Sequence, residues 1–245
     1  MKVCLAGSGW EKLWLDDNFY SFFRLQTFFH ISKRESEAIK KYDFFLLDSG
    51  AFSFFGKVDV EINKYIDDYI NFINKHDIQY FFELDLYTLP EYGIKKTEEI
   101  RAYIEQKTGK QTIPVFHKMC GIEYYKKLCN EYKYIAIGAS GMFDCRWTRS
   151  NPNQLKNMVL YARSKNVKVH GLGYTKIDML KEIPFFSVDS TSWLSGNRFG
   201  GIYVFNGKGF DKTKKPNGTR IKNNETAKHN FEEWIKFQKY ANTEF

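Results

Sequence analysis

Two aspartates, each at the end of a short apolar run, are the residues whose type and placement best suit chemistry. Asp48 closes the run 44–48 (Phe-Phe-Leu-Leu-Asp), and Asp189 closes the run 185–189 (Phe-Phe-Ser-Val-Asp). Burying a carboxylate at the end of a parallel strand is costly, so such a side chain usually faces a site. Two carboxylates across one pocket suit covalent glycosyl chemistry, in which one attacks the anomeric carbon and the other transfers the proton.

Strand-like runs that alternate with helical segments predict an α/β fold, a single (β/α)8 barrel of the TIM type. The eight expected strands are 2–6, 44–48, 80–86, 112–117, 134–138, 167–172, 185–189 and 201–205. Apolar residues at helical spacing predict helices over 62–73, 97–106, 122–132, 153–165 and 231–240, the last closing the fold. The segment 176–183 leaves room for only a short helix. A doubly wound open sheet is the rival architecture.

Polar residues and glycines follow several of these strands, and in a barrel the carboxyl ends of the strands meet at one mouth. Besides the two aspartates, the candidates are Ser49, Gly50, Asp85, His117, Gly138, Gly171 and Gly173. A glycine lets a flat ligand lie against the backbone and bond to its amides. Taken singly, an aspartate could cap a helix, the histidine could belong to the core, and each glycine could turn the chain. Their recurrence on consecutive strands favours a site.

Size and composition limit the class of protein. The 245 residues fit one domain spanning 1–245, and the net charge of +8 favours a polyanionic partner such as nucleic acid. A Lys-rich genome would give a basic chain as well. The four cysteines lack CxxC or Cys/His ligand spacing, so we expect reduced thiols and no metal. Without a leader-like or membrane-length apolar run, we expect a cytoplasmic protein that acts on no membrane.

Asp48-Ser49-Gly50-Ala51-Phe52 resembles the DSGGF motif of the tRNA-guanine (queuine) transglycosylases, which are themselves (β/α)8 barrels. Further runs are similar in kind and order to that family's from about residue 44 to 201. They are Leu84-Asp85, Pro114-Val115-Phe116-His117, Ile135-Ala136-Ile137-Gly138, His170-Gly171-Leu172-Gly173 and Val188-Asp189.

The resemblance implies a role for each matching residue. Asp189 would attack C1′ of a guanosine nucleotide, expel guanine and form a covalent ester. Asp48 would be the general acid and base for the departing and incoming bases. Asp85 would accept hydrogen bonds from the base, while His117 and the Gly138 backbone read its other edge. Two inversions would retain configuration, and no cofactor is implied.

Departures from the family pattern change the expected substrate. Ala51 and Ser53 replace a Gly and a Gln of the motif region, and His117 replaces a base-reading Gln. The family's Cys-x-Cys-x2-Cys…His zinc site is absent, and with it the subdomain that helps dock tRNA. The sequence therefore most resembles the compact phage and bacterial DNA-guanine transglycosylases, which place 7-deazaguanines in DNA.

We therefore expect exchange of guanine in DNA for a preQ0-like 7-deazaguanine, in the host cytoplasm if the gene is phage-borne. The expected partners are DNA or tRNA and the free base, with a homodimer or an accessory DNA-opening protein as further candidates. Three alternatives stay open: the same exchange on tRNA, a barrel N-glycosidase or nucleotide hydrolase, and a non-catalytic nucleic-acid-binding barrel.

A basic loop is expected over about 207–228, because residues 208–228 hold seven Lys or Arg against two acids. Cations near a barrel mouth could follow phosphates, although a solvated surface loop would look the same. The candidate phosphate contacts are Asn197, Arg198, Lys208, Lys212, Lys214, Lys215 and Arg220. Phe54, Trp193 and Phe199 would either stack around an extruded nucleotide or belong to the core.

Overall fold

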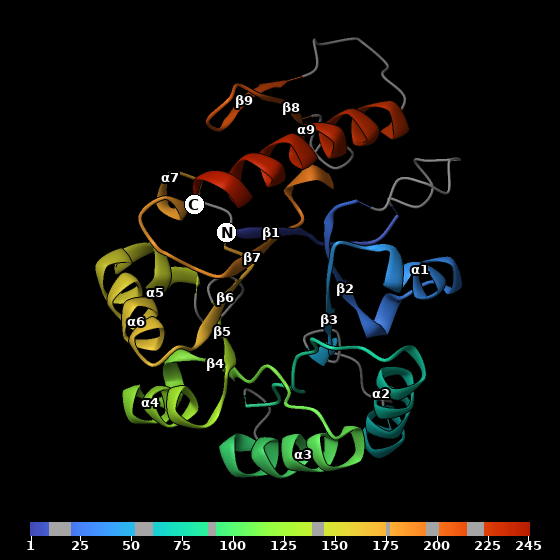
Figure 1. Cartoon of the computed structure of the whole chain (residues 1–245), viewed down its shortest axis with the longest axis vertical. Coiled ribbons are helices and arrows are strands. Elements are labelled where there is room, and N and C mark those ends of the chain that lie inside the picture. The colour runs from blue at the N-terminus through green and yellow to red at the C-terminus, as the bar shows by residue number, and fades with distance from the viewer. Residues whose placement is uncertain are drawn as a thin grey trace.

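A curled sheet of seven parallel strands, flanked by helices, forms the centre of the molecule (Figure 1). The computed structural model describes residues 1–9, 21–51, 61–87, 92–138, 145–174, 177–194, 201–214 and 223–245. The strands are β1 (Lys2–Leu5), β2 (Phe23–Thr27), β3 (Phe44–Asp48), β4 (Val115–Phe116), β5 (Tyr134–Gly138), β6 (Lys168–Leu172) and β7 (Ser187–Ser190). Their order across the sheet is β3-β2-β1-β7-β6-β5-β4.

The α-helices lie outside the curl (Figure 1). They are α1 (Lys33–Ala38), α2 (Ile62–His76), α3 (Gly93–Thr108), α4 (Ile122–Glu131), α5 (Cys145–Ser150), α6 (Pro152–Ser164), α7 (Ile177–Leu180) and α9 (Asn223–Glu244). The five helices expected from apolar spacing all form, as α2, α3, α4, α6 and α9, and α7 is the expected short helix. Local signals set several ends: Ser32 caps α1 through the Glu35 amide, and Gly109 ends α3 in the left-handed region. No helix in the described ranges is long and apolar enough to cross a membrane.

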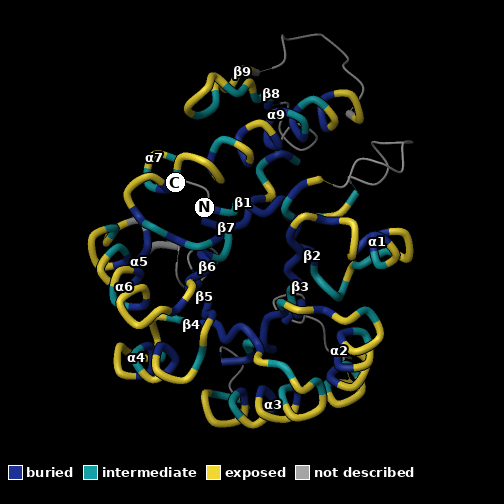
Figure 2. Tube along the Cα trace, in the orientation of Figure 1, coloured by how far each residue is buried: buried dark blue, intermediate teal, exposed yellow. Residues whose placement is uncertain are grey.

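The pleat of the strands separates two apolar layers. Alternate residues face the helices, and the residues between them face the interior of the curl. Figure 2 shows these strands as buried at the centre of the molecule. The inner layer comprises Cys4, Ala6, Leu25, Phe44, Leu46, Phe82, Ile113, Val115, Tyr134 and Ala136. Aromatic and aliphatic side chains thus fill most of the interior.

Strand β2 lies between β1 and β3, where no strand was expected. Arg24 and Gln26 alternate with apolar residues there, a pattern typical of a surface strand, yet both side chains are buried. Arg24 forms an ion pair of 2.6 Å with Glu35 of α1 and donates to the carbonyl oxygens of Leu5 and Gly7. Because the ion pair and these hydrogen bonds compensate for the loss of water, polar residues occupy positions whose burial would otherwise require apolar ones.

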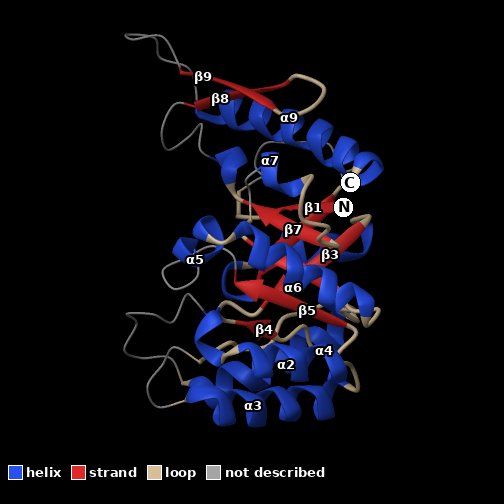
Figure 3. Cartoon of the chain, turned by 90° about the vertical axis from the view of Figure 1, so that its left-hand side faces the viewer, coloured by secondary structure: helices blue, strands red, loops and turns tan. Residues whose placement is uncertain are grey.

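The expectation that 201–205 forms the eighth barrel strand is wrong. This segment is β8 (Gly201–Phe205), which pairs antiparallel with β9 (Phe210–Lys214) in a separate two-stranded sheet. The four-residue loop 206–209, which begins with Asn206-Gly207, joins the two strands. The hairpin packs on α9, which lies between it and β1 (Figures 1 and 3). The expected basic loop therefore contains β9 and the first turn of α9 within its described part.

The segment 80–83 connects the two edges of the curled sheet. The Leu47 amide of β3 donates to the Tyr80 carbonyl (3.0 Å), and the Phe82 amide donates to the Leu47 carbonyl (2.9 Å). On its other side, Phe81 accepts from Ile113 (2.8 Å), just before β4. The strand expected over 80–86 is thus reduced to two isolated parallel bridges, Leu47 to Phe81 and Phe82 to Ile113.

Candidate active site

Strand pleating carries Asp48, Asp189 and His117 to the same end of the interior. Asp48 follows the inward-facing Leu46 by two residues, and His117 follows the inward-facing Val115 in extended backbone. Asp189 pairs in register with Cys4, another inward-facing residue. Because side chains two residues apart share a face of a strand, all three point into the carboxyl-terminal end of the curl.

Asp189 is a buried carboxylate with one oxygen occupied. Its Oδ1 accepts the backbone N–H of Gly173 at 2.5 Å and lies 3.2 Å from Nε2 of His170. The side chain is 11% exposed. The hydrogen bonds that it makes to described residues all go to Oδ1, so negative charge is stabilised there while Oδ2 stays available for reaction.

Asp48 has a different environment and a different protonation behaviour. Burial raises the pKa of Asp48 to about 7, and the nearby charges of Asp85 and Asp189 add to this effect. The Gly50 amide donates to its Oδ2 at 3.3 Å and opposes the rise. A carboxyl group with a pKa near neutrality can both deliver and accept a proton, as a general acid and base must.

The turn after β3 fixes the orientation of Asp48. Gly50 has a φ of +80°, and a Cβ there would lie 2.8 Å from Cβ of Phe29 and 3.0 Å from the Tyr65 hydroxyl. Only glycine fits this turn, so Gly50 has a backbone role. The Tyr65 hydroxyl donates to the Ser49 carbonyl at 2.6 Å. Ser49 is fully buried and its Oγ accepts from the Ala51 amide, so its side chain stabilises the turn.

Asp85 and His117, expected to read the base, are hydrogen-bonded to each other. Nε2 of His117 lies 3.1 Å from Oδ2 of Asp85, and the two side chains are 12% and 23% exposed. The edge of the Tyr87 ring contacts the His117 ring at a centroid distance of 5.7 Å. The Asp85 charge also raises the pKa of Asp48, so the Asp85–His117 pair interacts electrostatically with the candidate general acid and base.

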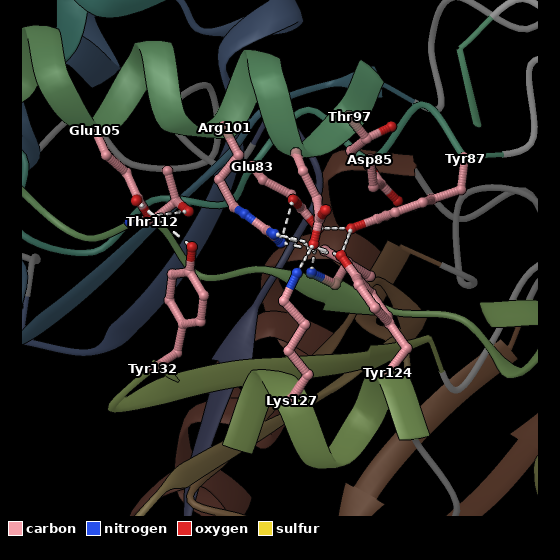
Figure 4. Close-up of polar contacts among 12 residues, drawn as sticks. Glu83, Asp85, Tyr87, Thr97, Arg101, Glu105, Thr112, Tyr124, Lys127 and Tyr132 are labelled. Carbon is pink, nitrogen blue, oxygen red and sulfur yellow. Dashed lines mark hydrogen bonds and ion pairs between the residues drawn. The ribbon is translucent and has the colours of Figure 1, made fainter. Parts of the chain in front are cut away.

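A buried polar cluster lies behind this pair, and sequence reasoning missed it (Figure 4). Glu83 is fully buried and accepts from the Val115 amide (2.6 Å), the Tyr87 hydroxyl (2.8 Å) and Arg101 of α3 (3.1 Å). Burial alone would lower the pKa of Arg101, but the Glu83 charge raises it. Arg101 also contacts the Tyr124 hydroxyl of α4 at 3.4 Å. The only sequence signal is a Glu inside the apolar run 80–86, which requires a buried cation nearby.

Besides Gly50, the three other glycines expected to line a base pocket have different surroundings. Gly138 is the buried last residue of β5, two residues beyond the inward-facing Ala136, and its backbone is at the site end of the interior. Gly173 contacts Asp189 through its N–H group. A Cβ at Gly171 would lie 3.0 Å from the Phe185 ring, so this glycine makes room for packing against the helices.

The expected nucleic-acid contacts are only partly described. Lys208 and Lys212 are exposed on the β8–β9 hairpin, and the Lys212 ammonium lies 5.2 Å from the centre of the Tyr203 ring. The backbone of Lys214 ends β9. The hairpin lies on the side of α9 that faces away from β1 (Figure 3). Outside the described residues are Asn197, Arg198, Lys215, Arg220, Phe54 and Phe199.

Trp193 belongs to the core, so its alternative role in stacking a nucleotide is wrong. The side chain is fully buried, its Nε1 donates to the Ala6 carbonyl at 2.7 Å, and its ring contacts Phe231 edge to face. A hollow of about 460 Å³ is lined by Lys2, Lys168 and Phe186 among others. These residues lie at the amino ends of the strands, so the hollow is remote from Asp48 and Asp189.

The described residues contain no group of three or more His, Cys, Asp or Glu that could hold a metal ion.

No protein-family model matches the sequence, and no curated protein matches it at a significant level.

Proposed function

We propose that this chain is a base-exchange transglycosylase that replaces guanine in DNA with a preQ0-like 7-deazaguanine. One observation carries the proposal: Asp189 has one bonded and one available oxygen, at the same end of the interior as an Asp48 whose pKa is about 7. An accessible carboxylate oxygen to attack the sugar and a neighbour that exchanges a proton near neutral pH are the two groups that retaining glycosyl transfer requires.

We further propose that the scaffold is a complete (β/α)8 barrel. The bridges of residues 80–83 to Leu47 and to Ile113 support this, because they would provide an eighth parallel segment between β3 and β4. In such a barrel β2 takes the place expected for 201–205, and α9 covers β1 as the last helix. The catalytic end would then be the carboxyl-terminal face, where (β/α)8 enzymes place their active sites.

In the first step, Oδ2 of Asp189 attacks C1′ of the nucleotide and forms the ester bond. The C1′–N9 bond breaks with its electron pair going to the base, and Asp48 gives its proton to the departing guanine. In the second step, the Asp48 carboxylate removes the N9 proton of the incoming base, whose nitrogen attacks C1′. The ester C1′–O bond breaks, Asp189 is regenerated as a carboxylate, and two inversions retain configuration.

Recognition of the base is assigned to the Asp85–His117 pair and the backbone at Gly138. Asp85 would accept hydrogen bonds from the base N–H groups, and the His117 ring, oriented by Asp85 and Tyr87, would present a nitrogen to its other edge. DNA as the polymer is supported by the net charge of +8 and by resemblance to the zinc-free DNA enzymes. A base must leave the helical stack to reach such a site, so flipped or single-stranded nucleotides are the expected substrates.

Base exchange tests this function directly. Labelled guanine or 7-deazaguanine is supplied with duplex DNA, single-stranded DNA or tRNA, with Asp189→Ala as the matched control. The proposal predicts label in DNA with wild type alone. Label in tRNA would reassign the polymer, and release of free guanine without any added base would indicate a hydrolase. Absence of both incorporation and release would contradict an enzymatic role.

A further inference from the structure

A chain of hydrogen-bonded side chains runs through the interior to Asp189. The Tyr134 hydroxyl is hydrogen-bonded to Oγ of Ser187, which lies 2.6 Å from Nδ1 of His170. Nε2 of His170 then lies 3.2 Å from Oδ1 of Asp189. His170 and Ser187 are completely buried, and the edge of the Phe82 ring contacts the imidazole at a centroid distance of 5.2 Å. No candidate role was given to Tyr134, Ser187 or His170 on sequence grounds.

We propose that His170 is a positioning residue, locked by Ser187 and Tyr134 in the Nε2–H tautomer, which holds Oδ1 of Asp189 and directs Oδ2 to C1′. The inference rests on the proposed function, because it assigns a partner to the nucleophile of that reaction.

Hydrogen-bond chemistry sets the tautomer. A carboxylate only accepts, so the nitrogen that faces Asp189 must carry the proton, and Nδ1 of a neutral ring must then accept. Ser187 therefore donates its hydroxyl proton to Nδ1 and accepts from Tyr134. Burial raises the pKa of the Tyr134 phenol, which keeps this group a donor. The opposite direction would place an unprotonated Nε2 against the carboxylate, with two lone pairs facing each other.

The same residues do not form a serine-nucleophile triad. Ser187 is fully buried in the interior and is hydrogen-bonded to both His170 and Tyr134, so its Oγ cannot reach a substrate. The aspartate is the more exposed end of this chain, with 11% of its side chain accessible. The accessible nucleophile is therefore the carboxylate, and the histidine acts on it through Oδ1.

This arrangement would help both halves of the exchange. With His170 and the Gly173 amide on Oδ1, the carboxylate cannot rotate freely, and Oδ2 keeps one orientation toward the sugar. After attack, Oδ1 becomes the carbonyl oxygen of the ester. The two N–H donors then stabilise the charge that returns to it when the second base displaces Asp189 from C1′.

Two substitutions separate donation from packing. His170→Leu introduces an apolar side chain of similar bulk and removes the N–H donor. His170→Gln, in contrast, can place an amide N–H near Oδ1. We expect His170→Leu to lower kcat for exchange by roughly 10- to 100-fold with little change in KM. His170→Gln should recover most of that loss. Equal rates for the two variants, or a wild-type kcat in His170→Leu, would overturn the inference.

A readout that needs no turnover separates this inference from the proposed function. Nitrogen NMR of ¹⁵N-histidine-labelled protein, with His170→Gln for assignment, reports which ring nitrogen of His170 is protonated. Protonation of Nε2 alone near neutral pH supports the tautomer and the hold on Oδ1 even if wild type exchanges no base; in that case only the direction of Oδ2 toward C1′ fails, together with the proposed function. The Nδ1–H tautomer or a doubly protonated ring would overturn it.

Discussion

Asp48 and Asp189 show how two identical side chains acquire different chemistry from their neighbours. Asp189 receives two nitrogen contacts on one oxygen, whereas desolvation and the charges of Asp85 and Asp189 raise the pKa of the partly buried Asp48 to about 7. This pair was predictable from sequence, because each aspartate ends an apolar run. His170, Glu83 and Arg101 were not, because each is made useful by a partner distant in sequence, and no residue spacing records such a partner.

Replacement of Asp48 by Asn should change stability in a pH-dependent way. The pKa of Asp48 is about 7 in the folded protein against an ordinary value of 3.8. Between about pH 4 and pH 7 the unfolded chain therefore ionises this group while the folded protein keeps the proton, and the wild type loses stability as pH rises. Relative to wild type, Asp48→Asn should therefore gain roughly 2–4 kcal/mol of unfolding free energy between pH 4 and pH 8. Urea denaturation at the two pH values measures the change.

Asp77 provides a control of opposite sign. The hydrogen bond and charge of Lys110 lower the pKa of this exposed carboxylate, so its contribution to stability is present at neutral pH and lost in acid. Asp77→Asn should thus become slightly less stable than wild type as pH rises, and Asn suits the left-handed backbone there. A pH-independent difference between Asp48→Asn and wild type would refute the raised pKa.

At the scale of elements, most helices followed from apolar spacing, while three strand assignments failed. β2 was missed because buried Arg24 and Gln26 give it a surface-like alternation. β8 was misplaced because an apolar strand pattern does not show which sheet a strand joins. The strand expected over 80–86 is reduced to two isolated bridges, and Glu83 within it accepts from Arg101 of α3.

The turn after β3 should be intolerant of any side chain at Gly50. Gly50→Ala combines a positive φ with a Cβ only 2.8 Å from Phe29, and we expect a loss of roughly 2–5 kcal/mol. Gly109→Ala is the matched control, because its φ is also positive but no atom lies within 4 Å of the added Cβ. That variant should lose about 1–2 kcal/mol. Equal thermal denaturation of the two variants would show that the close contact is unimportant.

The Glu83–Arg101 pair should stabilise the segment that carries Asp85 and Tyr87. Arg101→Met leaves the Glu83 carboxylate buried without its cation, which typically costs about 3–5 kcal/mol. Lys127→Met is the control. Lys127 also forms an ion pair, with Glu98, but its side chain is 45% exposed, and exposed pairs contribute about 0–1 kcal/mol. Chemical denaturation measures both variants. A loss in Arg101→Met no larger than that in Lys127→Met would contradict the role assigned to this cluster.

At the scale of the whole molecule, charge is the sequence property that bears on the polymer. The net charge of +8 predicts binding to DNA that weakens steeply with salt. The hairpin that carries Lys208 and Lys212 lies beyond α9, an arrangement that composition could not indicate (Figure 3).

We expect Lys208→Gln with Lys212→Gln to reduce the slope of log affinity against log salt by about two. The matched control combines Lys40→Gln with Lys133→Gln, exposed lysines that precede the amino ends of β3 and β5. Fluorescence anisotropy with a DNA oligonucleotide at several salt concentrations measures the slopes. Equal slopes for the two double variants would remove the hairpin from the DNA-binding surface.

The central claim is that Asp189 forms a covalent bond to C1′ of the substrate. Mass spectrometry of denatured protein, after incubation with a guanine-containing oligonucleotide and no acceptor base, tests it most directly. We expect a protein–DNA adduct on Asp189 in wild type and none in Asp189→Ala. The wild-type adduct should disappear when a 7-deazaguanine is added. Base exchange by wild type without any such adduct, or an equal adduct in Asp189→Ala, would contradict it.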